Sequence, residues 1–236
     1  MDNPHEMQVI AHIRSDFSSK FGIPRQSGLV KELRSTIVFE PEFRSGDALR
    51  GIEKFSHLWL IWQFSKAVRQ GWSPTVRPPR LGGNARMGVF ATRSPFRPNN
   101  LGLSCVRLEG VEHTDKYGDV LHVSGADLMD GTPIFDIKPY IPYADAYPDA
   151  RAGFADQAGD FLLEVIFPQK LLALLPEGKR EAAVGVLSHD PRPSYQRDPK
   201  RIYGLSFAGF NIRFFVRENT LTVVDVQPER ISRSYE

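Results

Sequence analysis

The residues of this chain best suited to bind an anion lie in one segment, Arg77–Ser104. Its 28 residues, RPPRLGGNARMGVFATRSPFRPNNLGLS, include five arginines, four glycines and four prolines. Arginine donates hydrogen bonds to phosphates, carboxylates and base edges, glycine lets the backbone approach a ligand closely, and proline fixes the path of a loop. The segment therefore favours a rigid anion-binding loop. The alternative is an ordinary arginine-rich loop that pairs with acidic residues elsewhere.

A second group of candidate functional residues, which could bind a metal ion or take part in catalysis, is acidic and lies in the segment Ala126–Tyr140. It places Asp127, Asp130 and Asp136 around a Gly-Thr-Pro turn, and the Asp-Gly pair at Asp130 is a turn signal in itself. The spacing of these acids matches no calcium loop, and the six histidines have no metal-binding spacing, so we predict no metal site. His57 opens the most apolar predicted strand, where a packed histidine is the alternative to a catalytic one.

Several common classes of protein are excluded by missing patterns. The chain has no phosphate-binding loop, no dinucleotide Gly-x-Gly-x-x-Gly and no Gly-x-Ser-x-Gly. Cys105 is the only cysteine, which excludes an internal disulfide and a multi-cysteine zinc site. The N-terminus lacks a signal-peptide pattern, and the longest apolar run, Leu58–Trp62, is far shorter than the ~20 residues that cross a bilayer. We therefore predict a cytoplasmic protein that does not use a membrane.

The charge of the chain is nearly balanced overall, at +2, but it is strongly segregated along the sequence. Residues 54–108 contain nine Lys and Arg and no acid, whereas residues 109–160 contain eleven acids and three bases. Such a separation creates a positive region that attracts an anionic polymer, unless the two stretches pair with each other in the fold. Arginine outnumbers lysine by 21 to 9, which suits contacts with phosphates or base edges.

The elements that must position these residues are predominantly strands in the first 140 residues. Because no helical periodicity occurs between residues 69 and 143, consecutive strands most easily pair antiparallel, and we predict an antiparallel β-barrel over residues 1–145. A short helix is expected in Gly46–Phe55. The expected strands, bounded by Gly, Pro, Asn and Asp, are Gln8–Ile13, Thr36–Phe39, His57–Phe64, Met87–Ala91, Leu103–Leu108, Val120–Ser124 and Ile134–Ile137.

The C-terminal residues 160–236 are predicted to form a small α+β domain after a connector over Pro142–Gly159. A strand over FLLEVIF (residues 161–167) is followed by a helical stretch, Gln169–Leu187, that is interrupted near Pro176. The last expected strands, of which the final two form a hairpin, are Tyr203–Phe207, Phe210–Val216 and Thr220–Val226. The whole chain is thus predicted to be mainly β, with two domains.

Several long motifs resemble those of one known family. They are PRQSGLV (24–30), FSHLWLIW (55–62), the arginine-rich segment 77–104 and DLMDGTPIFDIKPYIPYAD (127–145). With DPRPSY (190–195) and FNIR (210–213), they resemble the TsaA-like family and, within it, the TrmO-type tRNA methyltransferases, over nearly the whole chain. One departure is RPNNLG, where Asn100 and Leu101 replace a proline and an isoleucine without loss of a charged or catalytic group.

The resemblance implies a specific activity. Proteins of this family use an antiparallel β-barrel to bind S-adenosylmethionine, act as homodimers, and methylate N6 of threonylcarbamoyl-adenosine beside the tRNA anticodon. The candidates for catalytic proton transfer, which we do not rank, are Asp127, Asp130 and His57. The cofactor-binding residues carried over by matching positions are Pro24, Arg25, Gln26, His57, Leu58, Arg93, Leu103, Asp127, Leu128, Met129 and Asp130.

The resemblance also implies a partner for residues 54–108, the acid-free stretch, namely the tRNA anticodon loop. Trp72, Phe90 and Phe96 are candidates to stack on a base of that loop, with core packing as the alternative for each. Two other functions stay open, a non-catalytic RNA-binding module and a methyltransferase that acts on a small molecule. The arginines expected to contact RNA are Arg77, Arg80, Arg86 and Arg97.

Overall fold

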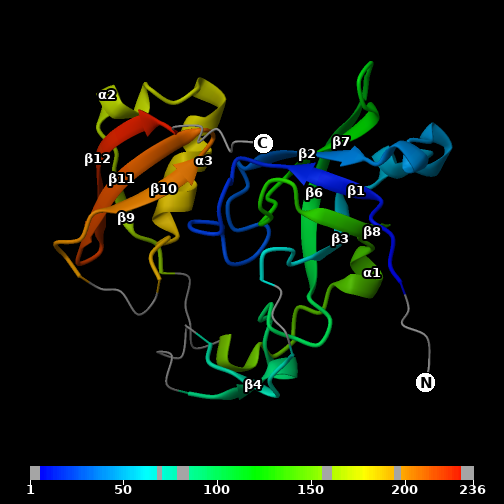
Figure 1. Ribbon diagram of the computed structural model, residues 1–236, viewed down its shortest axis with the longest axis horizontal. Coiled ribbons are helices and arrows are strands. Elements are labelled where there is room, and N and C mark those ends of the chain that lie inside the picture. Colours follow the sequence, from blue (N-terminus) through cyan, green and yellow to red (C-terminus); the bar gives the residue numbers. More distant parts are fainter. Residues whose placement is uncertain (1–5, 68–70, 79–84, 156–160, 194–197, 230–236) are drawn as a thin grey trace.

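The computed structural model contains two β units, with a long loop between them (Figure 1). It describes residues 6–67, 71–78, 85–155, 161–193 and 198–229. The first unit carries most of the residues singled out above, and the second is a smaller sheet with two helices. The prediction of a mainly β chain is confirmed.

Six antiparallel strands build the first unit. Their order is β1-β2-β7-β6-β3-β8, and β8 pairs back onto β1, so the sheet closes into a barrel. The strands are β1 (Ala11–Arg14), β2 (Arg34–Phe39), β3 (His57–Gln63), β6 (Leu101–Thr114), β7 (Gly118–Ser124) and β8 (Pro133–Pro139).

Alternation of side chains fills the interior of this unit. In β3, Leu58, Leu60 and Trp62 are buried, while the residues between them are partly exposed. Successive residues of a strand point to opposite faces, so every second side chain of β3 enters the core. Burial of apolar area at about 25 cal/mol per Å² is the main stabilisation of such a core.

Two local predictions differ from the structure. The helix expected over residues 46–55 is replaced by two 3₁₀ helices, η2 (Gly46–Leu49) and η3 (Ile52–Lys54), because Gly51 between them has φ +90. The strand expected over residues 87–91 is only β5 (Met87–Gly88), which pairs with β4 (Thr75–Val76) and leads into η5 (Val89–Ala91). The other short helices are η1 (Pro41–Phe43), α1 (Pro142–Asp145) and η6 (Gly153–Ala155), the last two within the predicted connector.

The second unit is a four-stranded sheet covered by helix α3. Its strand order is β10-β11-β12-β9, and β9 runs parallel to β12. The predicted interruption of the helical stretch is confirmed, and Pro176 directly precedes α3. The elements are β9 (Glu164–Ile166), α2 (Gln169–Leu172), α3 (Glu177–Ser188), β10 (Tyr203–Phe207), β11 (Phe210–Arg217) and β12 (Thr220–Pro228).

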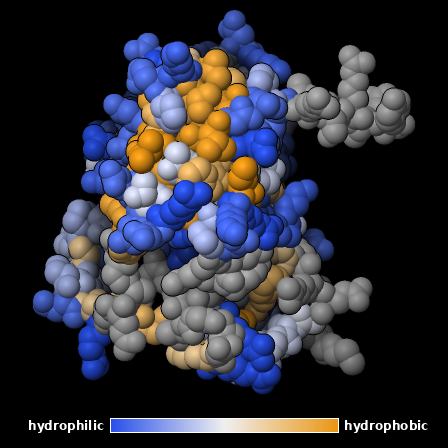
Figure 2. Space-filling view, turned by 90° about the vertical axis from the view of Figure 1, so that its left-hand side faces the viewer, coloured by the Kyte–Doolittle hydropathy of each residue, from blue (hydrophilic) through white to orange (hydrophobic). Residues whose placement is uncertain are grey.

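The face of the second unit turned away from the barrel carries an apolar area surrounded by hydrophilic residues (Figure 2). Large apolar side chains of this part that are exposed include Phe161, Leu162, Ile166, Leu174 and Val224. The opposite side of the sheet is packed, since Ala182, Ala183, Val186 and Leu187 of α3 are fully buried.

The loop between β1 and β2, residues 15–33, joins the two units. Phe17, Val30 and Leu33 of this loop are buried in the core of the second unit. The Ala208 backbone N–H donates to the Asp16 carbonyl at 2.9 Å, and Lys179 Nζ donates to the Asp16 carboxylate at 2.6 Å. The loop that carries the PRQSGLV motif is therefore anchored to the second unit.

Candidate functional site

Residues 26–28 lie directly against the barrel. The Gly28 backbone N–H donates to the Gly125 carbonyl at 2.8 Å, and the Cys105 N–H donates to Ser27 Oγ at 3.1 Å. Gly125 has φ +75, and a Cβ there would lie 3.3 Å from the Gly28 Cα. Only glycine meets both requirements without strain, so this close approach depends on Gly125.

Asp127 lies beside this contact and is hydrogen-bonded from the barrel interior. Ser104 Oγ donates to Asp127 Oδ1 at 2.6 Å, and the buried Trp62 Nε1 donates to Ser104 Oγ at 2.9 Å. Burial raises the pKa of the Asp127 carboxyl above its ordinary value, although hydrogen bonds from Ser104 and the Ser27 backbone and the charge of Arg93 act in the opposite direction. A partly buried carboxyl with a raised pKa is a candidate for proton transfer.

Arg93 reaches the same place from another loop. Its guanidinium donates to Gln26 Oε1, and Gln26 Nε2 donates to the Arg25 carbonyl at 2.6 Å. The position of Arg93 follows from a tight turn, in which Thr92 Oγ1 and N–H both donate to the Val89 carbonyl. Because the charge of Arg93 acts on Asp127, the structure brings together three predicted site residues that are far apart in the sequence.

The strand pair β3–β6 presents two further predicted residues. His57 of β3 is opposite Arg107 of β6, and Leu103 of β6 is opposite Ile61 of β3. His57 and Leu103 therefore both lie on the face of the strand pair that is turned away from buried Leu58. His57 Nδ1 lies 2.9 Å from Ser56 Oγ. Leu58 itself fills the barrel core at 0% exposure, so its side chain is packed inside the barrel.

The remaining predicted residues of the 127–130 run have structural contacts. Leu128 is fully buried, and its carbonyl accepts from Ser15 Oγ at 2.8 Å. The Met129 carbonyl accepts from Thr132 Oγ1 at 2.7 Å. Asp130 is exposed, accepts from the Ser15 backbone N–H at 3.0 Å and holds the start of the loop that follows β1. Asp127 and Asp130 therefore belong to different sets of contacts.

Pro24 and Arg25 complete the predicted residues of the first motif. Pro24 is buried and Arg25 is exposed. Of this motif, it is Gln26 that contacts Arg93, while Arg25 is at the surface and Pro24 is packed inside.

The predicted RNA-binding arginines occupy two kinds of position. Arg77 and Arg86 are exposed at the ends of the short β4–β5 pair. Arg97 is partly buried and donates to the carbonyls of Thr92, at 2.8 Å, and Ser94, at 3.4 Å, within its own loop. Arg80 lies outside the described residues.

Few ion pairs join the described residues of the acid-free stretch, 54–108, to those of the acid-rich stretch, 109–160. In the described part of the chain, one ion pair joins them, between Arg107 and Glu109 at 3.7 Å. Lys138 pairs instead with Asp136 inside the acid-rich stretch, at 2.9 Å. This distribution favours the interpretation that the cations of residues 54–108 are available to a ligand.

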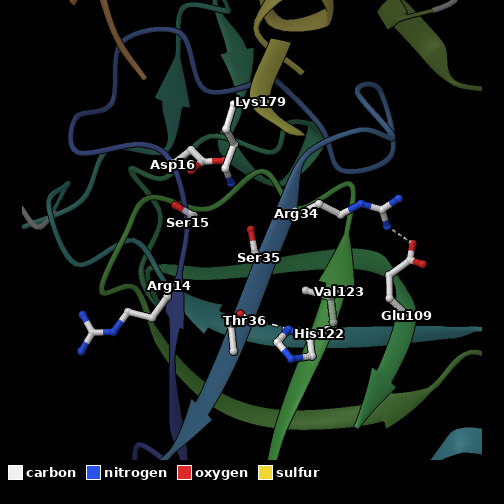
Figure 3. Close-up of a pocket in the computed structure, with 10 residues that line it drawn as sticks. All are labelled: Arg14, Ser15, Asp16, Arg34, Ser35, Thr36, Glu109, His122, Val123 and Lys179. Carbon is white, nitrogen blue, oxygen red and sulfur yellow. Dashed lines mark hydrogen bonds and ion pairs between the residues drawn. The ribbon is translucent and has the colours of Figure 1, made fainter. Parts of the chain in front are cut away.

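Figure 3 shows a different hollow, of about 540 Å³, beside β1, β2 and β7. Among its cations, Lys179 pairs with Asp16, and Arg34 pairs with Glu109. A hydrogen bond from Ser124 and the neighbouring arginines lower the pKa of Glu109, so this carboxylate stays charged. The hollow contains none of the described residues that the sequence predicts for cofactor or RNA binding, and paired charges make it a poor anion site.

Three residues of the candidate site, Ser27, Ser104 and Cys105, were not predicted from the sequence. Alternation along β6 places Leu103 and Cys105 on one face and Ser104 on the other, which a strand prediction could have indicated. Burial, and then the charge of Asp145, raise the pKa of the Cys105 thiol, so it is not activated as a nucleophile.

Within the described residues, no helix is long and apolar enough to cross a bilayer. The same part of the chain contains no group of three or more His, Cys, Asp or Glu side chains arranged to hold a metal ion.

Comparison with known proteins identifies the family. The sequence matches the tRNA-methyltransferase O N-terminal domain over residues 12–146 and the TrmO C-terminal domain over residues 162–229. It is 43% identical over 232 residues to the tRNA (adenine(37)-N6)-methyltransferase of Escherichia coli (strain K12), which covers 94% of this chain and 98% of the relative. A putative S-adenosylmethionine-dependent methyltransferase of Pseudomonas aeruginosa is 42% identical over 230 residues, covering 94% of this chain and 97% of the relative.

The fold agrees with this assignment. A crystal structure of TrmO from P. aeruginosa superposes with a TM-score of 0.79 at 37% identity, covering 97% of this chain and 99% of that one. The resemblance noted from the motifs is confirmed over both units. The chain therefore belongs to the tRNA-methyltransferase O (TrmO) family.

Proposed function

We propose that this protein is an S-adenosylmethionine-dependent methyltransferase that modifies N6 of the adenine at position 37 of tRNA. The names of its relatives support the reaction and the cofactor. The observation that carries the proposal is the meeting of Gln26, Arg93 and Asp127 at one edge of the barrel. These groups come from three segments, so the site depends on the whole fold of the first unit.

The residues at this edge fit S-adenosylmethionine chemically. Arg93 supplies a cation for a carboxylate, and Asp127 supplies an acceptor for an ammonium, amino or hydroxyl group. Leu103, which is 57% exposed on β6, offers an apolar surface for a base or an aliphatic chain. The cofactor, when bound, supplies a methyl group on a sulfonium, which is a good leaving group. The protein is then required mainly to hold the acceptor nitrogen in line.

A proton must leave N6 when the nitrogen gains a methyl group. We assign its removal to Asp127, directly or through a water molecule, because its raised pKa makes this carboxylate a stronger base than an ordinary one. Ser104 and Ser27 fix the direction in which the carboxylate points. His57, which contacts Ser56, and Asp130, which holds the β1 loop, are the alternatives.

The specific nucleoside that we propose as the methyl acceptor is threonylcarbamoyl-adenosine beside the anticodon, as the motif resemblance implies. The carboxylate of its threonyl group would need a cation, and the acid-free stretch supplies exposed arginines close in sequence to the site. Arg77 and Arg86, which are exposed and have no ion-pair partner among the described residues, are proposed to contact tRNA phosphates, with Arg80 assigned from its place in the sequence alone.

The proposal includes the organisation of the protein. Residues 1–145 form the cofactor-binding unit and residues 160–236 the small C-terminal unit, which the two separate hydrophobic cores support. The buried loop residues Phe17, Val30 and Leu33 connect the cores, so we expect the units to unfold together. A homodimer acting in the cytoplasm stays a prediction from the resemblance, and the mass of the protein in solution tests the dimer.

Calorimetry with S-adenosylmethionine tests the proposal against its rivals. A methyltransferase binds the cofactor saturably, whereas an RNA-binding module without catalysis does not. If the acceptor is tRNA, the apparent affinity for tRNA must fall steeply as salt rises. A protein that binds the cofactor but methylates only small molecules, with no salt dependence, would contradict the proposed substrate.

A further inference from the structure

Two large aromatic side chains lie exposed side by side near the candidate site. Trp72 is 54% exposed and Phe90 74% exposed, and their ring centroids are 6.2 Å apart with planes inclined by 32°. Phe96, by contrast, is partly buried. Since apolar side chains gathered at a surface mark binding sites, the Trp72–Phe90 pair points to a ligand with a flat apolar face.

The β4–β5 ladder and a hydrogen bond beside it hold the backbone between Trp72 and Phe90. Thr75 is opposite Gly88 and Val76 is opposite Met87 in the β4–β5 ladder. The Val89 N–H donates to the Pro74 carbonyl at 2.9 Å, and the Val89 side chain is buried. Phe90 follows this anchor in η5, so its ring faces outward from a backbone that is already held in place.

Two arginines, Arg77 and Arg86, flank the β4–β5 ladder that leads to Phe90. Arg77 directly follows β4 and Arg86 directly precedes β5, so both exposed arginines lie beside the same end of this ladder. Neither arginine has an ion-pair partner among the described residues.

We propose that Trp72 and Phe90 form a stacking platform for an unpaired base of the RNA substrate, while Arg77 and Arg86 contact the phosphates beside it. Aromatic faces accept unpaired bases, and a neighbouring cationic track follows the nucleic-acid backbone. An apolar protein partner would leave both arginines without a counter-charge, so the charge of this surface favours RNA. The proposal rests on the proposed function, because it assumes that the methyl acceptor is RNA.

The platform lies close to the cofactor site along the chain. Phe90 precedes Arg93 by three residues, and hydrogen bonds from Thr92 to the Val89 carbonyl hold the turn between them. A base held by the platform would therefore be a neighbour of the methylated base and would help to present the loop to the site.

Binding of two labelled RNAs to the full-length protein tests the platform. One is a hairpin with a single-stranded loop, and the other is a blunt duplex of the same length. We expect Trp72→Ala and Phe90→Ala each to weaken hairpin binding by roughly 5- to 150-fold, since loss of base–aromatic stacking has this effect. Duplex binding and S-adenosylmethionine affinity should be unchanged. Trp72→Phe, which keeps a ring, should retain most of the hairpin affinity.

Phe161→Ala is the matched control, because Phe161 is an exposed phenylalanine of the second unit, at 59%. It should leave hairpin binding unchanged. Equal losses for hairpin and duplex, or no loss for either platform variant, would overturn the platform. A change in the mass of the free protein with unchanged RNA affinity would overturn it too, by identifying a contact between protein chains. If wild-type protein neither binds the hairpin nor transfers a methyl group, the proposed function itself fails.

Discussion

Ser104 donates a 2.6 Å hydrogen bond to Asp127, and this contact joins the wall of the barrel to the surface residues of the candidate site. Ser104 is 1% exposed and also accepts a hydrogen bond from Trp62. The carboxylate is thus oriented by groups that cannot move without disturbing the core. Such support for a reactive group is a common feature of preorganised sites.

Replacing Asp127 tests its assignment as the proton acceptor. Asp127→Asn keeps an oxygen that accepts from Ser104 but cannot take up a proton, so we expect kcat to fall by roughly 10²- to 10⁴-fold. Because the base must be ionised, the wild-type rate should rise with pH through the raised pKa of Asp127. A pH–rate profile checks this. A variant that keeps both the rate and the rising limb would return the role to His57 or Asp130.

The same substitution has an opposite effect on stability. The folded state raises the pKa of Asp127, so this carboxyl favours folding below its unfolded pKa of about 3.9 and the contribution is lost as pH rises through the folded-state pKa. At pH 7 the wild type carries a charge that burial disfavours. Asp127→Asn should therefore be more stable than the wild type at pH 7, with the difference shrinking as pH falls below about 4. Urea unfolding at both pH values measures it, and a less stable variant at pH 7 would contradict the sign.

Arginines of the two loops should separate cofactor binding from RNA binding. Arg93→Ala removes a charged donor beside Asp127 and Gln26, and should weaken S-adenosylmethionine binding by roughly 10- to 100-fold. Arg86→Ala, the control, should leave that affinity intact and make the salt dependence of tRNA binding shallower by about one unit. Calorimetry and salt titrations measure the two quantities. Equal losses of both affinities in both variants would mean that these arginines hold the fold together.

The close approach at Gly125 should be sensitive to a single methyl group. Gly125→Ala adds a Cβ at 3.3 Å from Gly28 in a left-handed conformation, and should destabilise the protein by about 1–2 kcal/mol. Cofactor affinity should fall with it, because residues 26–28 are displaced. Gly178→Ala is the control: this glycine lies in α3 with nothing within 4 Å of the added Cβ, so the change should stabilise slightly. Equal melting temperatures for the two variants would show that Gly125 is not under this constraint.

Much of the fold was predictable because local patterns encode it. The apolar segment His57–Phe64 was predicted as a strand and forms β3, and turn residues indicated the positions of most other strands. The sequence also indicated Arg93 and Asp127, but only the structure brings them together with Ser27 and Ser104. That arrangement depends on a loop docking on a distant strand, which no local periodicity specifies. For the same reason, the burial of Phe17 in the second core was not foreseen.

Transfer of a labelled methyl group from S-adenosylmethionine to tRNA tests the central claim most directly. Wild-type protein is incubated with tRNA that carries, or lacks, threonylcarbamoyl-adenosine beside the anticodon, and the tRNA is then digested to nucleosides. The account predicts label on N6 of threonylcarbamoyl-adenosine and none in the unmodified tRNA. Label on the unmodified adenine alone would contradict the assignment of threonylcarbamoyl-adenosine as the methyl acceptor. Label at another position, or no transfer to either tRNA, would contradict the proposed function.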